Sequence, residues 1–453
     1  MNRTETLRHR DQSAIWHPFT QMADWEKDTA LIVERGEGNY LIDTDGRRYF
    51  DGVSSLWVNL FGHRRPEIDE AIRSQLDRLA HSTFLGLTHI PAIELAEKLL
   101  VLSPPGLSRV FYSDNGSTAM EIAIKMAFQY WQQKTGGESK KEFLTHSEAY
   151  HGDTLGSVSA GGIDLFHKIF RPLLFTTHRI PTPHCYRCPY GLTRKSCALA
   201  CAEKMDERVR SLRQVLAAFI VEPLVQGAGG MLMMPEGYLA RVRAITQECG
   251  VLLICDEVAT GFGRTGTLFA CNQEKVSPDV MAVAKGLTGG YLPLAATLTT
   301  EELYRAFLGR YEEFRTFFHG HSYTANPLGC AAALATLSIF EKEDVLGRVS
   351  VLSRLMAKEL ERLESHRHIG EIRQKGLMAG IEIVADRETK ESFTAEKKVG
   401  QRVTLKVREK GIILRPLGDV IVLMPPLSST EEEIKNLVRS TAWAIKAVLS
   451  GDE

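Results

Sequence analysis

The chain has 453 residues, of which 44% are hydrophobic and 25% charged, and its 55 Lys and Arg balance 56 Asp and Glu to a formal net charge of -1. This composition supports a large buried core and excludes disorder as the main state, and the charge balance gives no electrostatic reason to expect nucleic acid or a membrane surface as a partner. The polar start has no apolar signal segment behind it, and no apolar run approaches the roughly 20 residues that cross a bilayer. We therefore expect a cytoplasmic protein with reduced cysteines.

The middle of the chain alternates short apolar runs with helical patterns. Nearly continuous apolar runs of strand length are typical of parallel strands that are buried on both faces of a sheet. Repeated strand–helix units predict an α/β fold with a doubly wound, mostly parallel sheet. The predicted strands are 109–114, 217–221, 251–255 and 280–284, and the predicted helices among them are 118–131 and 237–248.

The pattern changes after residue 326 and predicts a second, smaller α+β domain. A helix over 326–340 is expected to bridge the domains, and a Ser-Ser-Thr cap predicts the start of a terminal helix near residue 429. We expect an N-terminal segment, 1–69, that contributes to the small domain and to the mouth of the active site, a large domain, 70–335, and a small domain, 336–453. The other predicted elements of the small domain are a helix over 349–363 and strands within 369–384 and 412–425.

Four chemical features follow predicted strands, where a doubly wound sheet places its ligands. The turn at Gly116 and Ser117 precedes a helix whose free N–H groups suit an anion. Asp256 ends a strand, Lys285 lies in an apolar run that favours a neutral amine, and Tyr150 offers an aromatic ring for stacking. Each feature alone also fits a structural role: a plain connection, a helix cap, a lysine that reaches solvent, or a core aromatic.

Together the four features match what pyridoxal 5′-phosphate requires, namely a lysine for a Schiff base, an acid for the pyridine nitrogen and a phosphate cradle. Their order resembles that of fold-type-I pyridoxal-phosphate enzymes. The run from Asp256 to Gly266 (DEVATGFGRTG) is similar to the signature of class III aminotransferases. A non-catalytic protein of the same fold would have no need of both Lys285 and Asp256.

Shorter motifs resemble one branch of this class, the 8-amino-7-oxononanoate aminotransferases of biotin synthesis. The matching runs are Trp16–Met22 (WHPFTQM), Ser54–Trp57 (SSLW), His319–Tyr323 (HGHSY) and Arg415–Gly418 (RPLG). The resemblance implies the conversion of 8-amino-7-oxononanoate to 7,8-diaminononanoate in a homodimer with shared active sites.

The resemblance also implies a role for individual residues. Lys285 would hold the cofactor and carry the proton during catalysis, Arg415 would grip the carboxylate of the acceptor, and Trp57 would contact its apolar chain. Glu222 would support the ring, with a structural role nearly as well favoured. The full cofactor-binding set is Gly116, Ser117, Tyr150, Asp256 and Lys285, with His321 and Ser322 from the other subunit; the substrate-binding set is Phe19, Trp57, Tyr150, Lys285, Gly320 and Arg415.

The amino donor is the least constrained part of this prediction. The family is best known for S-adenosylmethionine, which is our expectation, and L-lysine is the alternative. Phe19 stands where many members have a tyrosine, and Val422 where they have an aromatic residue, and both departures resemble the branch that uses lysine. Another class III aminotransferase, acting on ω-amino acids, would share the cofactor site.

Four cysteines lie close together in the sequence, at Cys185, Cys188, Cys197 and Cys201. Their spacing allows a structural zinc ion with four thiolate ligands, although the second pair departs from the common CxxC spacing. Four free thiols in a loop are the equal alternative. The predicted chemistry itself needs no metal.

Overall fold

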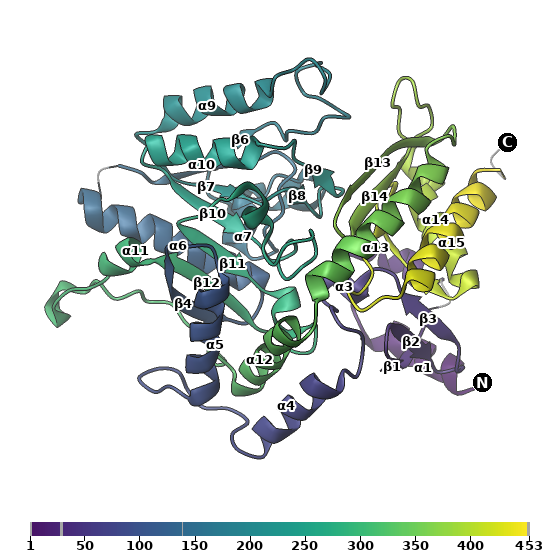
Figure 1. The fold of residues 1–453 in the computed structure, drawn as a ribbon, viewed down its shortest axis with the longest axis horizontal. Helices are drawn as coiled ribbons and strands as arrows, with labels where there is room; N and C mark the ends of the chain where they lie inside the picture. The colour runs from purple at the N-terminus through teal and green to yellow at the C-terminus, as the bar shows by residue number, and fades with distance from the viewer. Residues whose placement is uncertain (1, 28–29, 138, 451–453) are drawn as a thin grey trace.

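The computed structural model describes residues 2–27, 30–137 and 139–450. A large unit is built around a long central sheet, and a smaller unit holds both ends of the chain (Figure 1). Within the described ranges, no helix has the length and hydrophobicity that a membrane span requires.

The large unit contains a seven-stranded sheet of order β4-β12-β11-β10-β7-β5-β6. Strands β11, β10, β7, β5 and β6 run parallel, whereas β12 is antiparallel to both of its neighbours. The predicted α/β fold with a mostly parallel sheet is therefore confirmed, with an antiparallel strand that the sequence pattern did not indicate. The strands are β4 (Leu107–Ser113), β5 (Glu142–His146), β6 (His178–Ile180), β7 (Leu216–Val221), β10 (Leu252–Asp256), β11 (Val280–Val283) and β12 (Ala295–Thr300).

Helices cover both faces of this sheet, which explains the uninterrupted apolar runs. Helix α6 (Gly116–Thr135) packs on one face, while α10 (Tyr238–Glu248) lies on the other with α9 (Ala200–Leu212) against it (Figure 1). Alternate residues of one strand enter two different cores: Met281 and Val283 belong to one, Val280 and Ala282 to the other. A polar side chain in such a strand would be buried away from water on either face, which costs free energy unless the side chain is hydrogen-bonded.

Further helices pack against one another around the sheet of the large unit. Helix α12 (Pro327–Lys342) contacts both α4 (Pro66–Leu76) and α5 (Ile90–Leu102). The shorter helices of this unit are α7 (Leu155–Ala160), α8 (Asp164–His167) and α11 (Glu301–Arg305).

The smaller unit combines the two ends of the chain. Its four-stranded sheet has the order β13-β14-β17-β16, and a second sheet pairs β15 near the C-terminus in parallel with β3 near the N-terminus. Thr430 caps the last helix with a capping box, so the helix begins at Glu431. The strands are β1 (Val33–Glu37), β2 (Tyr40–Asp43), β3 (Arg48–Asp51), β13 (Ile369–Lys375), β14 (Met378–Ile383), β15 (Ile412–Ile413), β16 (Arg415–Leu417) and β17 (Val420–Leu423); the helices are α1 (Arg3–Ala14), α2 (Met22–Trp25), α3 (Ser54–Trp57), α13 (Val345–Leu360), α14 (Val399–Val407) and α15 (Glu431–Leu449). A two-stranded ribbon of β8 (Val225–Gln226) and β9 (Leu232–Met233) leaves the large unit toward the smaller one (Figure 1).

Candidate active site

A cavity of about 450 Å³ opens at the carboxyl ends of the central strands. It is the place at which a parallel sheet gathers the residues that follow its strands. Seven residues predicted from the sequence line it together: Trp57, Gly116, Ser117, Tyr150, Glu222, Asp256 and Lys285. The fold therefore brings one predicted amine, two predicted carboxylates, two aromatic rings and a helix N-terminus to one enclosed space.

Lys285 lies just beyond β11, in the left-handed region of the backbone with φ 44°. Its Nζ is 5.0 Å from the centroid of the Trp57 ring. Burial lowers the pKa of Lys285, while the carboxylates of Asp256 and Glu222 act in the opposite direction. A lowered pKa increases the share of neutral amine, which is the nucleophilic form.

Asp256 ends β10 and is buried together with a histidine. Its Oδ2 lies 2.8 Å from Nδ1 of His151, and its Oδ1 accepts a hydrogen bond of 3.0 Å from the Val258 amide. The His151 side chain has no solvent exposure, so it holds the Asp256 carboxylate from the buried side. His151 follows Tyr150 directly in the sequence, but no local signal pairs it with Asp256, because only the fold brings the two side chains together.

The N-terminus of α6 forms a cradle for an anion. Asn115 caps the helix through the Thr118 amide, and among the described residues no acceptor binds the amides of Gly116 and Ser117. A Cβ atom at Gly116 would lie 2.6 Å from Cγ1 of Val258, so this approach requires glycine. Unbonded amides and the positive end of the helix dipole suit a phosphate group.

Glu222 connects two parts of the cavity wall. One carboxylate oxygen accepts a bond of 3.0 Å from the Tyr150 amide, and the other accepts one of 2.9 Å from the Gly227 amide. Burial raises the pKa of Glu222 to about 7. The hydroxyl of Tyr150 donates to Asp153 at 2.7 Å, which orients the ring at the cavity edge. Of the two roles expected for Glu222, these contacts favour the structural one.

A second cavity of about 750 Å³ adjoins the first and contains the other predicted substrate residues. Phe19 and Arg415 line it, and Ala228 lines both cavities. The Arg415 guanidinium lies 5.9 Å from the centroid of the Phe19 ring, and no carboxylate of the described ranges forms an ion pair with it. A cation of this kind in a cavity is a ready partner for the carboxylate of a ligand.

Phe166 is a further residue that the sequence analysis missed. Its ring centroid is 5.4 Å from that of Phe19 and 6.2 Å from that of Tyr150. The three rings thus form an apolar wall that runs from the outer cavity to the inner one. No local sequence signal marks Phe166, because α8 is only one turn long.

Gly320, His321 and Ser322 lie in the segment that precedes α12, and none of the three lines either cavity. Gly320 and Ser322 are exposed, and Nδ1 of His321 lies 3.8 Å from Oδ2 of Asp114, which lines the inner cavity. Their assignment to the site of another subunit stays a prediction.

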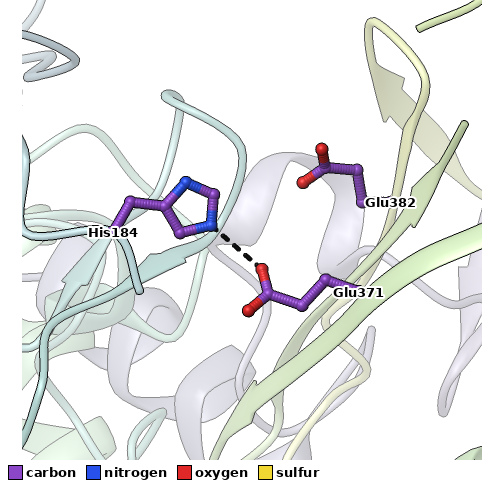
Figure 2. Close-up of side chains that lie close together, drawn as sticks. All are labelled: His184, Glu371 and Glu382. Atoms are coloured by element: carbon purple, nitrogen blue, oxygen red, sulfur yellow. Dashed lines mark hydrogen bonds and ion pairs between the residues drawn. The ribbon is translucent and has the colours of Figure 1, made fainter. Parts of the chain in front are cut away.

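The four neighbouring cysteines are free thiols in and just after the connection between β6 and α9. Burial raises the pKa of Cys185, and that of Cys201 to about 11. Among the described residues, one group of three or more potential ligands lies within 4.8 Å, and it is His184, Glu371 and Glu382 rather than these cysteines (Figure 2). Zinc analysis of protein purified without chelator decides between the ion and free thiols.

Comparison with known proteins places this cavity in context. The family model described as aminotransferase class-III matches residues 21–445. The adenosylmethionine-8-amino-7-oxononanoate aminotransferase of Nitratidesulfovibrio vulgaris is 55% identical over 448 residues, which are 99% of this chain and 83% of that protein. The protein of the same name from Geobacter sulfurreducens is 52% identical over 99% of both chains.

Solved structures show the same similarity. The crystal structure of adenosylmethionine-8-amino-7-oxononanoate aminotransferase from Methanocaldococcus jannaschii has a TM-score of 0.94 at 46% identity and covers 98% of this chain and 99% of its own. An amine transaminase from an uncultivated Pseudomonas species, solved in its PLP-bound form, has a TM-score of 0.91 at 37% identity over 96% of this chain and 98% of its own. The predicted cavity residues therefore lie within a fold that is shared over nearly the whole chain.

Proposed function

The chain belongs to the class III aminotransferases, and on that premise we propose that it transfers an amino group to 8-amino-7-oxononanoate, with S-adenosylmethionine as the donor. The names of relatives that are 55% and 52% identical support both substrates. In the structure, the observation that carries the proposal is the junction of two cavities at Ala228, one with Lys285 and Asp256, the other with the uncompensated cation of Arg415. The reaction belongs to biotin synthesis, and we propose the cytoplasm as its location.

The cofactor of this family is pyridoxal 5′-phosphate, and the inner cavity fits it. Lys285 would hold it covalently, the amides of Gly116 and Ser117 would hold its phosphate, and Asp256 would hold a proton at the pyridine nitrogen. The Nε1 atom of Trp57 is buried without a hydrogen-bond partner among the described residues, which leaves a donor free for a ligand. When bound, the cofactor carries the amino group and stabilises negative charge at the adjoining carbon.

The protein supplies proton transfer, orientation and exclusion of water. The lowered pKa of Lys285 would let its free amine take a proton from the α-carbon of the substrate and return it to C4′ of the cofactor. His151 holds the carboxylate of Asp256 in place at 2.8 Å, and that carboxylate would face the pyridine nitrogen. Arg415 would bind the acceptor carboxylate with two parallel hydrogen bonds, and Trp57 and Phe19 would exclude water from the apolar chain.

A half-reaction screen tests the proposal. The protein loaded with pyridoxal phosphate is mixed with one amino donor at a time, and the absorption band of the lysine-bound cofactor is followed. We expect S-adenosylmethionine to remove the band and 8-amino-7-oxononanoate to turn over only after that donor. If L-lysine removes the band and S-adenosylmethionine does not, the donor is wrong while the acceptor and cofactor stand.

The ω-amino-acid aminotransferases are the second candidate. Solved ω-transaminases reach TM-scores of 0.94 and 0.93 at 37% and 30% identity, so the fold alone does not separate the two activities. An ω-amino acid that removes the band, combined with no turnover of 8-amino-7-oxononanoate, would favour this second function.

A further inference from the structure

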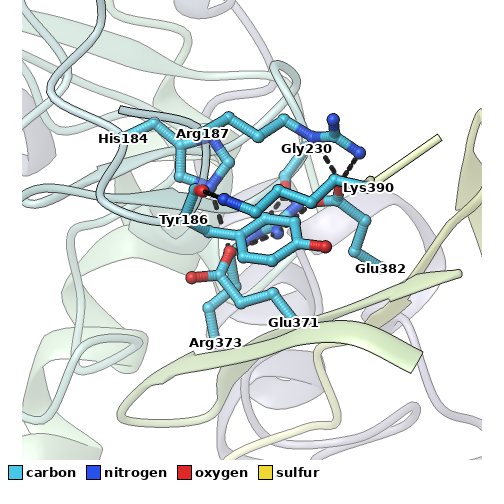
Figure 3. A network of polar contacts seen from close by, with 8 residues as sticks. All are labelled: His184, Tyr186, Arg187, Gly230, Glu371, Arg373, Glu382 and Lys390. Carbon is cyan, nitrogen blue, oxygen red and sulfur yellow. Dashed lines mark hydrogen bonds and ion pairs between the residues drawn. The ribbon is translucent and has the colours of Figure 1, made fainter. Parts of the chain in front are cut away.

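A buried polar network joins the two units beside the outer cavity. Arg373, on β13 of the smaller unit, is only 5% exposed. Its Nε and Nη2 donate to the carbonyl oxygen of Gly230 in the large unit, at 2.9 and 2.6 Å, and its Nη1 donates to Glu371 at 2.7 Å and to Glu382 at 2.5 Å (Figure 3). We call these four residues the Arg373 network.

The acidic members of this network do not form a vacant metal site. His184, Glu371 and Glu382 have ligand atoms within 4.8 Å of one another (Figure 2). However, Arg373 already donates to both carboxylates, and Arg187 donates to Glu382 at 2.7 Å. Two guanidinium groups therefore balance two carboxylates, and the bonds from Arg373 to the Gly230 carbonyl form a fixed joint between the units.

The sheet that carries Arg373 also carries Arg415, and the strand register aligns the two. Arg373 pairs with Gly380, Gly380 with Val422, and Val422 with Arg415. Residues directly opposite in antiparallel strands point to the same face, so both arginines lie on one face of the sheet. Three strand spacings place them roughly 14 Å apart along this row.

The loop bound by Arg373 is part of the substrate cavity wall. Gly230 and Gly229 line the outer cavity, and Gly227, at the other end of the loop, donates to Glu222. A Cβ at Gly227 would lie 3.2 Å from the Trp57 ring. One short loop therefore contacts the inner site at Gly227 and the smaller unit at Gly230.

Gly380 allows the loop to lie close to the sheet. A Cβ added there would be 3.0 Å from Cβ of Met231 and 3.3 Å from the carbonyl oxygen of Gly230. Both distances are shorter than ordinary van der Waals contacts. Arg373 therefore holds the loop on the sheet through its hydrogen bonds, and the absence of a side chain at Gly380 leaves room for the loop.

We propose that Arg373 is a positioning residue that fixes how far Arg415 lies from Lys285, and so which acceptor length fits. This inference rests on the proposed function. The acceptor carries its carboxylate at one end and its reacting carbon near the other, so two groups in different units must bind it at once. A misplacement of about 1 Å can cost roughly a hundredfold in rate, so a rigid joint between the units acts on specificity.

Two variants test the proposal by different physical routes. Arg373→Lys keeps the charge but loses the paired donors to Gly230, and Gly380→Ala pushes the loop away with every charged group left in place. We expect each to lower kcat/KM for 8-amino-7-oxononanoate about tenfold or more, through KM, and to weaken its preference over homologues one methylene shorter or longer. The cofactor band and its trapping by borohydride should not change.

Arg187→Gln is the matched control, because it removes a more exposed partner of Glu382 and leaves the Arg373 network intact. It should retain the wild-type length preference. The proposal is overturned if Gly380→Ala, and Arg373→Lys where it folds, keep the wild-type KM and length preference. If the wild-type protein does not convert 8-amino-7-oxononanoate, the proposed function is overturned instead. The same variants, tested on the carboxylate substrate that the protein does accept, would still decide the role of Arg373.

Discussion

Strained backbone conformations occur at the inner cavity and in the turn just before Trp57. Lys285 and Trp57, which line the cavity, and Ser54 and Ser55, which precede Trp57, all have φ between 44° and 64°, a region that residues other than glycine rarely adopt. Each such residue costs on the order of 1–3 kcal/mol and persists only where neighbours hold it. Here the Ser54 hydroxyl donates to the Met424 carbonyl at 2.7 Å across the two ends of the chain. The strain thus lies where the proposed chemistry needs a fixed amine and a fixed ring.

Lys285→Ala should fold, bind pyridoxal phosphate without a covalent bond, and lose transamination. The amine is both the covalent anchor and the proton carrier, and proton transfer by a positioned side chain contributes roughly 10²–10⁴-fold. Borohydride treatment followed by mass spectrometry should show no attached cofactor, while circular dichroism matches the wild type. Turnover near the wild-type rate would contradict the assignment.

Asp256→Asn should retain the cofactor but reduce turnover by roughly a hundredfold. In the wild type, His151 lies 2.8 Å from the Asp256 carboxylate, and asparagine keeps an oxygen for this contact. Asparagine has no charge, however, to hold a proton at the pyridine nitrogen. Steady-state rates and cofactor titration separate the two effects. A variant with unchanged kcat would show that Asp256 does not have this role.

Arg415→Lys should raise KM for the keto acid roughly tenfold to a hundredfold, with a smaller effect on cofactor binding. Lysine keeps the positive charge but loses one of the paired donors, and a hydrogen bond to a charged group contributes about 1.5–3 kcal/mol. The acceptor half-reaction, started from protein already loaded with the amino group, measures this directly. An unchanged KM would move the carboxylate site elsewhere.

At the scale of an element, α6 shows how the start of a helix becomes a binding site. Asn115 and Thr118 bond to each other in a capping box. This leaves the amides of Gly116 and Ser117 without a capping partner. Gly152 lies against the same turn, since a Cβ there would be 1.9 Å from Oγ of Ser117. The helix start is therefore enclosed by neighbouring loops that leave space for a phosphate but not for side chains.

Gly116→Ala should weaken cofactor binding, and the overpacking should also lower the stability of the free protein by roughly 1–3 kcal/mol. The added methyl group would meet Cγ1 of Val258 at 2.6 Å and displace the turn that presents the amides. Fluorescence titration with pyridoxal phosphate should show an affinity at least about tenfold lower, a cost of roughly 1.4 kcal/mol. Alanine at the half-buried position Ser139, outside this turn, is the control variant and should bind the cofactor as the wild type does. Equal affinities of Gly116→Ala and wild type would contradict the cradle.

At the scale of the whole molecule, the site depends on both units. The parallel pairing of β15 with β3 joins the two ends of the chain, and this places Trp57 and Arg415 beside a cavity built by the large unit. The Arg373 network adds a second joint on the other side of the substrate path. Substrate recognition is therefore shared between elements that are far apart in the sequence.

The homodimer that the resemblance implies can be tested at this scale. A His321→Ala, Ser322→Ala double variant and Lys285→Ala should each have little activity as homodimers. A mixed dimer purified with two affinity tags should regain activity, because one of its sites combines an intact Lys285 with the intact pair from its partner. Failure to regain activity in a mixed dimer that forms would contradict a shared site.

The sequence by itself determined the class of fold, and it marked the lysine, the acid and the helix start that the fold brings together in the inner cavity. Strands β7, β10 and β11 were predictable because strands buried on both faces exclude polar residues, and Asp256 and Lys285 were marked as polar exceptions near strand ends. The start of α15 was predictable from the cap at Thr430. These signals are local, since each depends on residues within one element.

Only the tertiary structure decided which distant residues meet. Nothing local indicates that His151 holds Asp256, that Phe166 continues the wall from Phe19, or that Arg373 binds a carbonyl 143 residues away. The antiparallel direction of β12 likewise depends on its neighbours rather than on its own residues. Such contacts form when separate elements pack, and their geometry is set by the joint burial of all of them rather than by any single run of residues.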